Sequence, residues 1–463
     1  MEKYLKKIEN HISFHMPGHK GREVFDSNMQ DITKWDITEI PGADNLQDPE
    51  GIIKAIEDRY GAYYESTRSF IMVNGSTGGI LSMIMAATKP GDTVIVDSNC
   101  HKSVINGLML GRLNPIFVNA DTDTNGIPMS VNVDKIIDII SSRDDIKAVI
   151  ITSPNYFGYV SNISKLKKAI LNRDIVVMVD EAHGSHLRLS CKLPDDSIEM
   201  GADIVVHSIH KTLLGLTQTA ALHVNSYKID IEKIKHFLYC FQTSSPSYIL
   251  MASLEKSIDI VEKKGEDLME KLLFNIDEFF NDCNEYLSIV KVLDYRNLKN
   301  YDNTKLILDI ANLDISTSQF LDILAKDYSI EVEMTMGEYI LLMTSINSEK
   351  KDFDELLRAL MDIEKIYGVK NHKKENLIDY AFKLNQKVNP WTAFYMEKED
   401  IKLKDSVGRI SGSSIVPYPP GIPVISVGQE ITKDVVSFII KNRNSFNQII
   451  GLKDEEIKVL KGC

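Results

Sequence analysis

Between residues 69 and 224 the chain alternates short apolar segments with longer helix-like segments, and this alternation restricts the fold more than any other feature of the sequence. Strands that alternate with helices predict a mostly parallel, doubly wound sheet with helices on both faces, an α/β architecture. The predicted strands span residues 69–73, 93–96, 115–118, 148–152, 176–180, 203–207 and 219–224.

Polar and glycine-containing segments follow five of these strands. In doubly wound sheets, ligands bind outside the carboxyl ends of the strands, which lie along one edge. We therefore expect a single site to be built from residues 74–79, 97–103, 153–158, 180–186 and 208–211.

The segment after the first strand reads Asn-Gly-Ser-Thr-Gly-Gly and opens a predicted helix. Free backbone N–H groups and the positive end of the helix dipole favour a phosphate there. Gly75, Ser76 and Thr77 are therefore candidate phosphate contacts, although the two hydroxyls also suit an ordinary helix cap. The patterns GxxxxGK[ST] and GxGxxG are absent from the sequence, which argues against nucleoside triphosphates and dinucleotides.

Lys211 lies in a polar turn between two apolar strands, together with Ser208 and His210. Poor solvation lowers the pKa of an ammonium group below its usual value of about 10.4, and the resulting amine can act as a Schiff-base nucleophile. The alternative interpretation is a lysine on an exposed turn.

Two further polar side chains stand at strand ends. Asp180 ends an apolar strand, where a carboxylate is costly to bury unless it meets a cation, such as a protonated pyridine nitrogen. His101 precedes a helix, where its ring can stack on an aromatic cofactor or cap the helix. A metal site at Asp180, His183 and His186 is the competing interpretation, but the HExxH spacing is missing and we expect no metal.

A phosphate cradle, an aromatic stacker, a buried carboxylate and a buried amine are together what pyridoxal 5′-phosphate requires. No other common cofactor needs all four. The residues therefore predict a pyridoxal 5′-phosphate enzyme.

The amino-acid composition restricts the classes of molecule that the protein is expected to bind. The 463 residues include 53 basic and 66 acidic side chains, and the net charge of −13 argues against nucleic acid and anionic membranes while mildly favouring a cationic small molecule. Five widely spaced cysteines without a CxxC pair are typical of a reducing compartment. With no signal-peptide pattern and no run of about 18 apolar residues, we expect a cytoplasmic protein.

The chain also closely resembles the Orn/Lys/Arg decarboxylase family of fold-type-I pyridoxal-phosphate enzymes. Nine segments carry the resemblance, in the family's order: FHMPGHKG, TEIPGADNL, VNGSTGG, NCHKSV, TSPNYFGYV, VDEAHGSH, SIHKTL, TSSPSY and VPYPPGIPV. It implies a large domain of the aspartate-aminotransferase kind followed by smaller α+β domains. It also implies a homodimer or higher homo-oligomer with shared active sites.

The resemblance implies residue roles as well. Lys211 would carry the cofactor covalently, Asp180 would pair with the pyridine nitrogen, and His101 would stack on the ring. His183 would neighbour the phenolic oxygen. The implied catalytic residues are Lys211, His210, Asp180 and His101. The implied cofactor contacts are Gly75, Ser76, Thr77, His101, Asp180, His183, Ser208, His210 and Lys211.

The implied reaction is α-decarboxylation of a basic amino acid to an amine and CO2, with arginine expected before lysine and ornithine. A buried substrate cation needs a carboxylate partner, and Glu39, Asp44 and Asp48 in the early loops are the candidates. Near residues 409–414 small polar residues stand where the family pattern has an acidic one. This departure bears on the substrate and leaves the cofactor chemistry untouched.

Two other functional classes share much of this pattern. A pyridoxal-phosphate aminotransferase has the same lysine and aspartate but usually binds the α-carboxylate through an arginine. A non-enzymatic binding protein on this fold would be expected to have lost part of the set Ser76, His101, Asp180, His183 and Lys211, all of which are present.

Four regions are expected along the chain. They are an arm with active-site loops (1–65), a large cofactor-binding domain (66–265), a small α+β domain (266–370) and a C-terminal domain (371–463). A long helix at 249–280 would carry the chain out of the large domain. The proline-rich segment at 414–423 cannot be helical and is expected to be extended.

Overall fold

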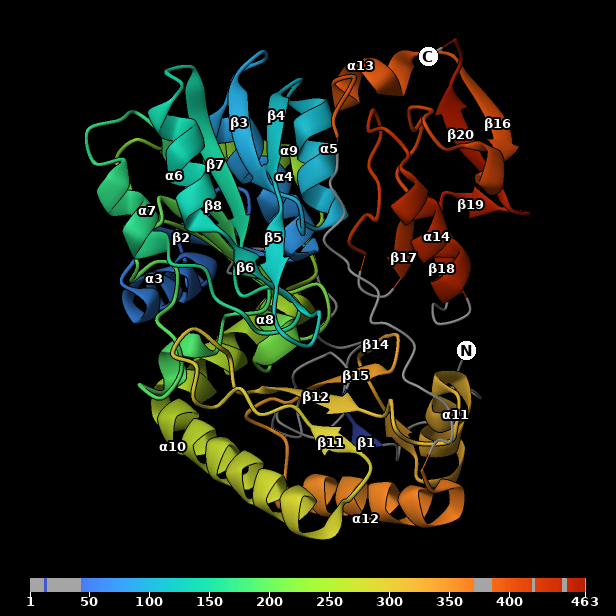
Figure 1. Cartoon of the computed structure of the whole chain (residues 1–463). Helices are drawn as coiled ribbons and strands as arrows, with labels where there is room; N and C mark the ends of the chain where they lie inside the picture. Colours follow the sequence, from blue (N-terminus) through green and yellow to red (C-terminus); the bar gives the residue numbers. More distant parts are fainter. Residues whose placement is uncertain (1–11, 15–42, 370–384, 419–420, 444–447, 463) are drawn as a thin grey trace.

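The structure, a computed structural model, describes residues 12–14, 43–369, 385–418, 421–443 and 448–462 (Figure 1). In this view a large α/β domain lies above a smaller α+β domain, a C-terminal domain lies beside the large one, and the short helix α8 (Ile209–Thr212) lies on the side of the large domain that faces the small one. The early loop that contains Glu39 lies outside the described residues.

The large domain is built around a seven-stranded sheet. Its strands, in spatial order, are β2 (Arg68–Met72), β10 (Ala220–Val224), β9 (Ile204–His207), β8 (Val176–Asp180), β7 (Ile146–Thr152), β3 (Thr93–Asp97) and β4 (Asn114–Val118). Each neighbouring pair from β9 to β4 is parallel, and β10 runs antiparallel to both of its neighbours. The predicted mostly parallel sheet is confirmed, with strand ends shifted by one or two residues.

Helices cover both faces of this sheet, which explains why its strands are apolar throughout. Met178 and Val206 are buried in one layer, whereas Val177, Val179 and Val205 are buried in the other. The first layer contains α4 (Gly75–Ala87), α5 (Lys102–Leu110) and α9 (Ile231–Phe241). The second contains α3 (Ile52–Tyr64), α6 (Val133–Ser141), α7 (Ile163–Ala169) and part of α10 (Tyr248–Tyr286). The hairpin β5 (Ala120–Thr122) and β6 (Pro128–Val131) extends beyond the sheet.

Helix α10 leads from the large domain into the small one, as predicted for the long helix at 249–280. The domain boundary expected near residue 265 falls inside this helix. The small domain has a four-stranded sheet in the order β11 (Lys291–Val292), β12 (Lys305–Asp309), β15 (Tyr339–Met343) and β14 (Met334–Met336). Helices α11 (Thr317–Asp327) and α12 (Lys350–Tyr367) complete it. β1 (Ile12–Ser13) pairs in parallel with β13 (Ile330–Glu331).

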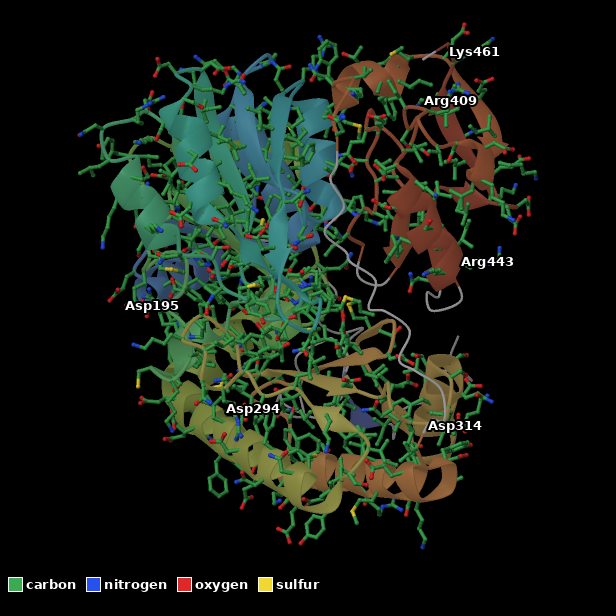
Figure 2. The ribbon with its side chains drawn as sticks, in the orientation of Figure 1. Asp195, Asp294, Asp314, Arg409, Arg443 and Lys461 are labelled. Atoms are coloured by element: carbon green, nitrogen blue, oxygen red, sulfur yellow. The ribbon has the colours of Figure 1, made fainter. Side chains whose placement is uncertain are left out.

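The C-terminal domain has its own apolar core. Its elements are α13 (Pro390–Tyr395), β16 (Lys398–Lys402), β17 (Val416–Tyr418), α14 (Lys433–Asn442), β18 (Gln448–Ile450), β19 (Leu452–Lys453) and β20 (Glu456–Leu460). Within the proline-rich segment, residues 416–418 are extended as predicted, because they form β17. Arg409, labelled in Figure 2, lies in this domain and pairs with Glu399 at 2.6 Å.

The C-terminal domain contacts the helix that starts at the candidate site. The side chain of Asn389 donates a hydrogen bond to Asn114 (2.7 Å), and the backbone N–H of Lys102, the first residue of α5, donates to the carbonyl of Gly421 (3.2 Å). Within the described ranges, no helix has both the length and the apolarity needed to cross a membrane.

Candidate active site

The carboxyl ends of β8 and β9 bring the two central residues together. Asp180 is the last residue of β8, and Lys211 lies in α8, which follows β9 after Ser208. The Nζ atom of Lys211 lies 3.1 Å from Nε2 of His183. The fold thus places three of the predicted residues at one edge of the sheet.

The environment of Lys211 favours its uncharged amine. Burial lowers the pKa of Lys211; the carboxylates of Asp180 and Glu333 oppose this shift, and the charge of Lys305 adds to it. A lysine whose proton is easily lost is a competent nucleophile. The predicted direction of the pKa shift is confirmed, and the exposed-turn interpretation is wrong.

Asp180 is a buried carboxyl group that accepts a hydrogen bond from the backbone. Its Oδ1 accepts the N–H of Ala182 at 3.2 Å, and the side chain is almost fully buried. Burial raises the pKa of Asp180, while the charge of Lys211 and the Ala182 N–H lower it. Such a carboxyl gains most from a cationic partner at the sheet edge.

His101 is both a cap and a candidate ring stacker. Its Nδ1 accepts the backbone N–H of Ser103 at 3.3 Å and lies 2.8 Å from that residue's Oγ, so only one edge of the ring is used for capping α5. Burial, with the nearby charges of Lys211 and Lys102, lowers the pKa of His101 to about 3. The imidazole is therefore neutral, and its faces suit stacking.

His183 is buried beside the ring of Tyr156, with the two ring centroids 4.6 Å apart. Burial, reinforced by the charge of Lys211, lowers the pKa of His183 well below its usual value. Its Nδ1 has no hydrogen-bond partner in the described part of the chain. A buried polar atom without a partner is costly, so this atom is suited to contact a bound group.

The phosphate candidates meet at the start of α4. Gly75 is the first residue of the helix and adopts φ +70°, with open space where a Cβ would be. Among the described residues, the hydroxyls of Ser76 and Thr77 make no hydrogen bond, and the buried Oγ of Ser208 likewise has no partner. Hydroxyls and helix N–H groups in this arrangement suit an anion. His210 lies beside them and its ring Nδ1 is 2.9 Å from the carbonyl of Thr219.

The competing metal interpretation groups Asp180 with His183 and His186. No group of three or more potential metal-ligating side chains occurs within residues 43–369 or the other described ranges. His186 instead points to the small domain, where its Nε2 lies 3.0 Å from Oδ1 of the buried Asp302. Asp302 also pairs with the buried Lys305 at 3.2 Å. These contacts join the loop after β8 to the small domain.

Asp44, one of the three predicted substrate carboxylates, is occupied by contacts with the backbone. Asp44 accepts backbone N–H groups at the start of α3, from Glu50 (3.0 Å), Gly51 (2.8 Å) and Ile53 (2.8 Å). Burial raises the pKa of Asp44, but these N–H groups together outweigh it, and the pKa lies below its usual value. Asp48 is exposed. Glu39 lies outside the described residues.

The structure adds a carboxylate that the sequence reasoning missed. Glu333 lies in the small domain between β13 and β14, is 2% exposed, and accepts a hydrogen bond from the hydroxyl of Tyr156. It is close enough to Lys211 to raise the pKa of that lysine. In the sequence, residues 330–336 alternate apolar and polar side chains, and this pattern does not distinguish Glu333 from Glu331.

Comparison with known proteins agrees with this architecture. The family model described as Orn/Lys/Arg decarboxylase, major domain, matches residues 2–311, and that of the C-terminal domain matches residues 376–458. An arginine decarboxylase of Bacillus anthracis is 29% identical over 98% of this chain and 94% of its own length. The inducible lysine decarboxylase of Escherichia coli K12 is 24% identical over 93% and 74%. The crystal structure of the Francisella novicida lysine decarboxylase superposes with a TM-score of 0.80 at 20% identity, covering 94% of this chain and 76% of that one.

The parallel sheet with its two helical layers and following domains defines a fold-type-I α/β enzyme, as predicted. The chain belongs to the Orn/Lys/Arg decarboxylase family. It is a decarboxylase, and the resemblance found in the nine sequence segments is confirmed.

Proposed function

We propose that this decarboxylase binds pyridoxal 5′-phosphate at Lys211 and releases CO2 from a basic amino acid, arginine first, then lysine and ornithine. The observation that carries this proposal is the buried amine of Lys211. It lies 3.1 Å from Nε2 of His183, and the charge of Asp180 affects its pKa. The similarity to arginine decarboxylases over nearly the whole chain supports the order of substrates.

The described residues fit the proposed cofactor. The unpaired hydroxyls of Ser76, Thr77 and Ser208, with the N-terminus of α4, would hold its phosphate. Asp180 would meet the pyridine nitrogen, and the unpartnered Nδ1 side of His183 would meet a ring substituent. This fit rests most on Ser208 Oγ and His183 Nδ1, which are buried and have no partner among the described residues.

When bound, pyridoxal 5′-phosphate supplies an electron sink for the electrons of the breaking Cα–carboxylate bond. Asp180 holds a proton on the pyridine nitrogen, and Lys211 provides an unprotonated Nζ. His183, whose Nε2 is 3.1 Å from Nζ, stays neutral and orients that amine. His210, oriented by its contact with the Thr219 carbonyl, is the proposed proton donor to Cα.

Glu333 is the proposed partner of the substrate's side-chain cation. It is a buried carboxylate contributed by the small domain, and Tyr156 holds it next to the same edge of the sheet as His183. A guanidinium group gains most from a carboxylate because two hydrogen bonds can form side by side. Asp44 is a weaker choice because its oxygens already accept backbone N–H groups.

We expect Glu333→Gln to lower kcat/KM for arginine by about 10- to 100-fold, mostly through KM, because a charge-assisted hydrogen bond is lost. The measurement is CO2 release from arginine, lysine, ornithine and neutral amino acids by the wild type and the variant. Asp48→Asn, which changes an exposed carboxylate, serves as the matched control. A neutral or acidic amino acid as the best substrate would overturn the cationic-substrate proposal, and loss in Asp48→Asn alone would reassign the carboxylate.

We also propose an obligate homodimer or higher homo-oligomer with shared active sites. Residues 243–245 are exposed. They follow Gln242, whose side chain accepts the N–H of Val73 at 3.0 Å, and they therefore lie next to the phosphate candidates. A second subunit covering this segment would complete the site. Gel filtration at high dilution should therefore show the dimer whenever activity is present, and an active monomer would contradict the proposal.

The cellular setting proposed from the sequence is the cytoplasm. Cys100, Cys191, Cys240 and Cys283, the cysteines within the described ranges, are all free. Free thiols, two of them exposed, suit a reducing compartment.

A further inference from the structure

A buried carboxylate–imidazole pair lies directly behind the cofactor edge of the sheet and has no role in the chemistry described so far. Glu181 follows Asp180, and His207 precedes Ser208. Both side chains are fully buried, and Nε2 of His207 lies 2.9 Å from Oε2 of Glu181.

The contact between Glu181 and His207 lies where strands β8 and β9 end. In the parallel register of β8 and β9, Asp180 stands opposite Val206, so Glu181 stands opposite His207. The N–H of Glu181 donates to the carbonyl of Val206 at 3.0 Å. Successive side chains in a strand point to opposite faces. The pair therefore bridges the strand ends on the face away from Asp180.

The surroundings hold Glu181 in one position. Its carboxylate accepts hydrogen bonds from the N–H (3.1 Å) and the Oγ–H (2.9 Å) of Ser197. A Cβ on Gly184 would lie 2.6 Å from Cγ of Glu181, so the turn that carries His183 closes tightly over this side chain. A larger residue at Gly184 would force the two apart.

The imidazole of His207 is held equally closely. Its ring packs against Tyr64 (4.7 Å between centroids) and His223 (4.8 Å), and the Tyr64 hydroxyl donates to the carbonyl of Ser185 at 2.6 Å. His223 in turn lies 2.7 Å, through Nδ1, from Oγ of Ser69 on β2. The cluster thus spans from the edge strand to the loop after β8.

Charge is balanced within this cluster. Burial raises the pKa of Glu181 well above its usual value and lowers the pKa of His207 to about 3. Both shifts favour the uncharged forms of the two groups. The nearest charged neighbours, Arg188 and Asp196, are paired with each other at 2.6 Å, so the region behind Asp180 is electrically neutral.

We propose that Glu181 and His207 are positioning residues of the cofactor site. The bond between them fixes the ends of β8 and β9, and with them the separation of Asp180 from Ser208 and Lys211. This inference rests on the proposed binding of pyridoxal 5′-phosphate at Lys211. It concerns residues that touch neither cofactor nor substrate.

The test replaces two buried carboxylates by alanine, one at each end of the same two strands, and compares the variants. Asp203 is the matched control: it is buried, accepts the N–H of Val177 at 2.8 Å, and lies just before β9 at the end remote from Lys211. Glu181→Ala and Asp203→Ala are each titrated with pyridoxal 5′-phosphate as apoprotein. The thermal midpoint, the visible absorbance of the bound cofactor, kcat and KM are also measured.

Both deletions should lower the thermal midpoint, but only Glu181→Ala should weaken cofactor binding and lower kcat, each by about 10- to 100-fold, as for other supporting residues of a site. Glu181→Gln, which keeps the hydrogen bonds, should recover most of the affinity. His207→Phe keeps the ring packing and removes the bond, so it should reproduce the loss even if Glu181→Ala fails to fold.

Unchanged cofactor affinity and absorbance in His207→Phe would overturn the inference and leave a purely structural role. Wild-type protein that binds no cofactor at Lys211 would instead contradict the proposed function, so the two failures are distinguishable.

Discussion

Replacement of Lys211 by alanine should lower the decarboxylation rate by about 10⁴-fold or more, the scale seen when a catalytic nucleophile is removed. The protein should remain folded, because the substitution removes the contact with His183 Nε2, while Asp180, whose burial favours its protonated form, keeps the Ala182 N–H. Cofactor should still bind, more weakly, through Ser76, Thr77 and Ser208. The measurement is CO2 release at saturating substrate, with the thermal midpoint recorded alongside.

Chemical trapping gives an independent check on the same residue. The wild-type protein should be yellow, and borohydride should fix the mass of the cofactor on the peptide that contains Lys211. Lys102→Ala, a lysine one residue after His101, is the control and should keep both colour and label. Label on a different lysine, or none, would contradict the site assignment.

Asp180→Asn should lower kcat by more than about 10²-fold, the scale of a single lost electrostatic contact in a closed site. The amide cannot balance a protonated pyridine nitrogen, whereas it can keep the contact with the Ala182 N–H, so folding stability should change far less than the rate. Activity and thermal midpoint of the purified variant are the two measurements.

Asp97 provides the matched control for this substitution. It is also a buried carboxyl at a strand end, on β3, where its Oδ1 accepts the N–H of Asn99 at 2.9 Å. Burial raises the pKa of Asp97 to about 7. Asp97→Asn keeps that acceptor oxygen and should retain most of the activity. Normal turnover in Asp180→Asn combined with a large loss in Asp97→Asn would show that the wrong carboxylate was chosen.

Much of the candidate site could be predicted because its residues follow strands directly. Asp180 and Lys211 lie at or just beyond the ends of apolar segments, and parallel strands bring their carboxyl ends to one edge. The same local logic located His101 at the start of a helix. Patterns of this kind depend on a few neighbouring residues, so they can be read without knowing the rest of the fold.

The sequence by itself therefore determined the α/β class, the strand positions, the family and the lysine-centred cluster. Only the tertiary structure decided that Asp44 binds the start of α3, that Glu333 of the small domain lies near Lys211, and that Glu181 meets His207. The contacts of Glu333 and Glu181 join residues distant in the chain, whereas Asp44 meets backbone groups only a short way along it. Their distances depend on how domains and strands pack, and a carboxylate's neighbours along the chain carry no information about which distant group it will meet.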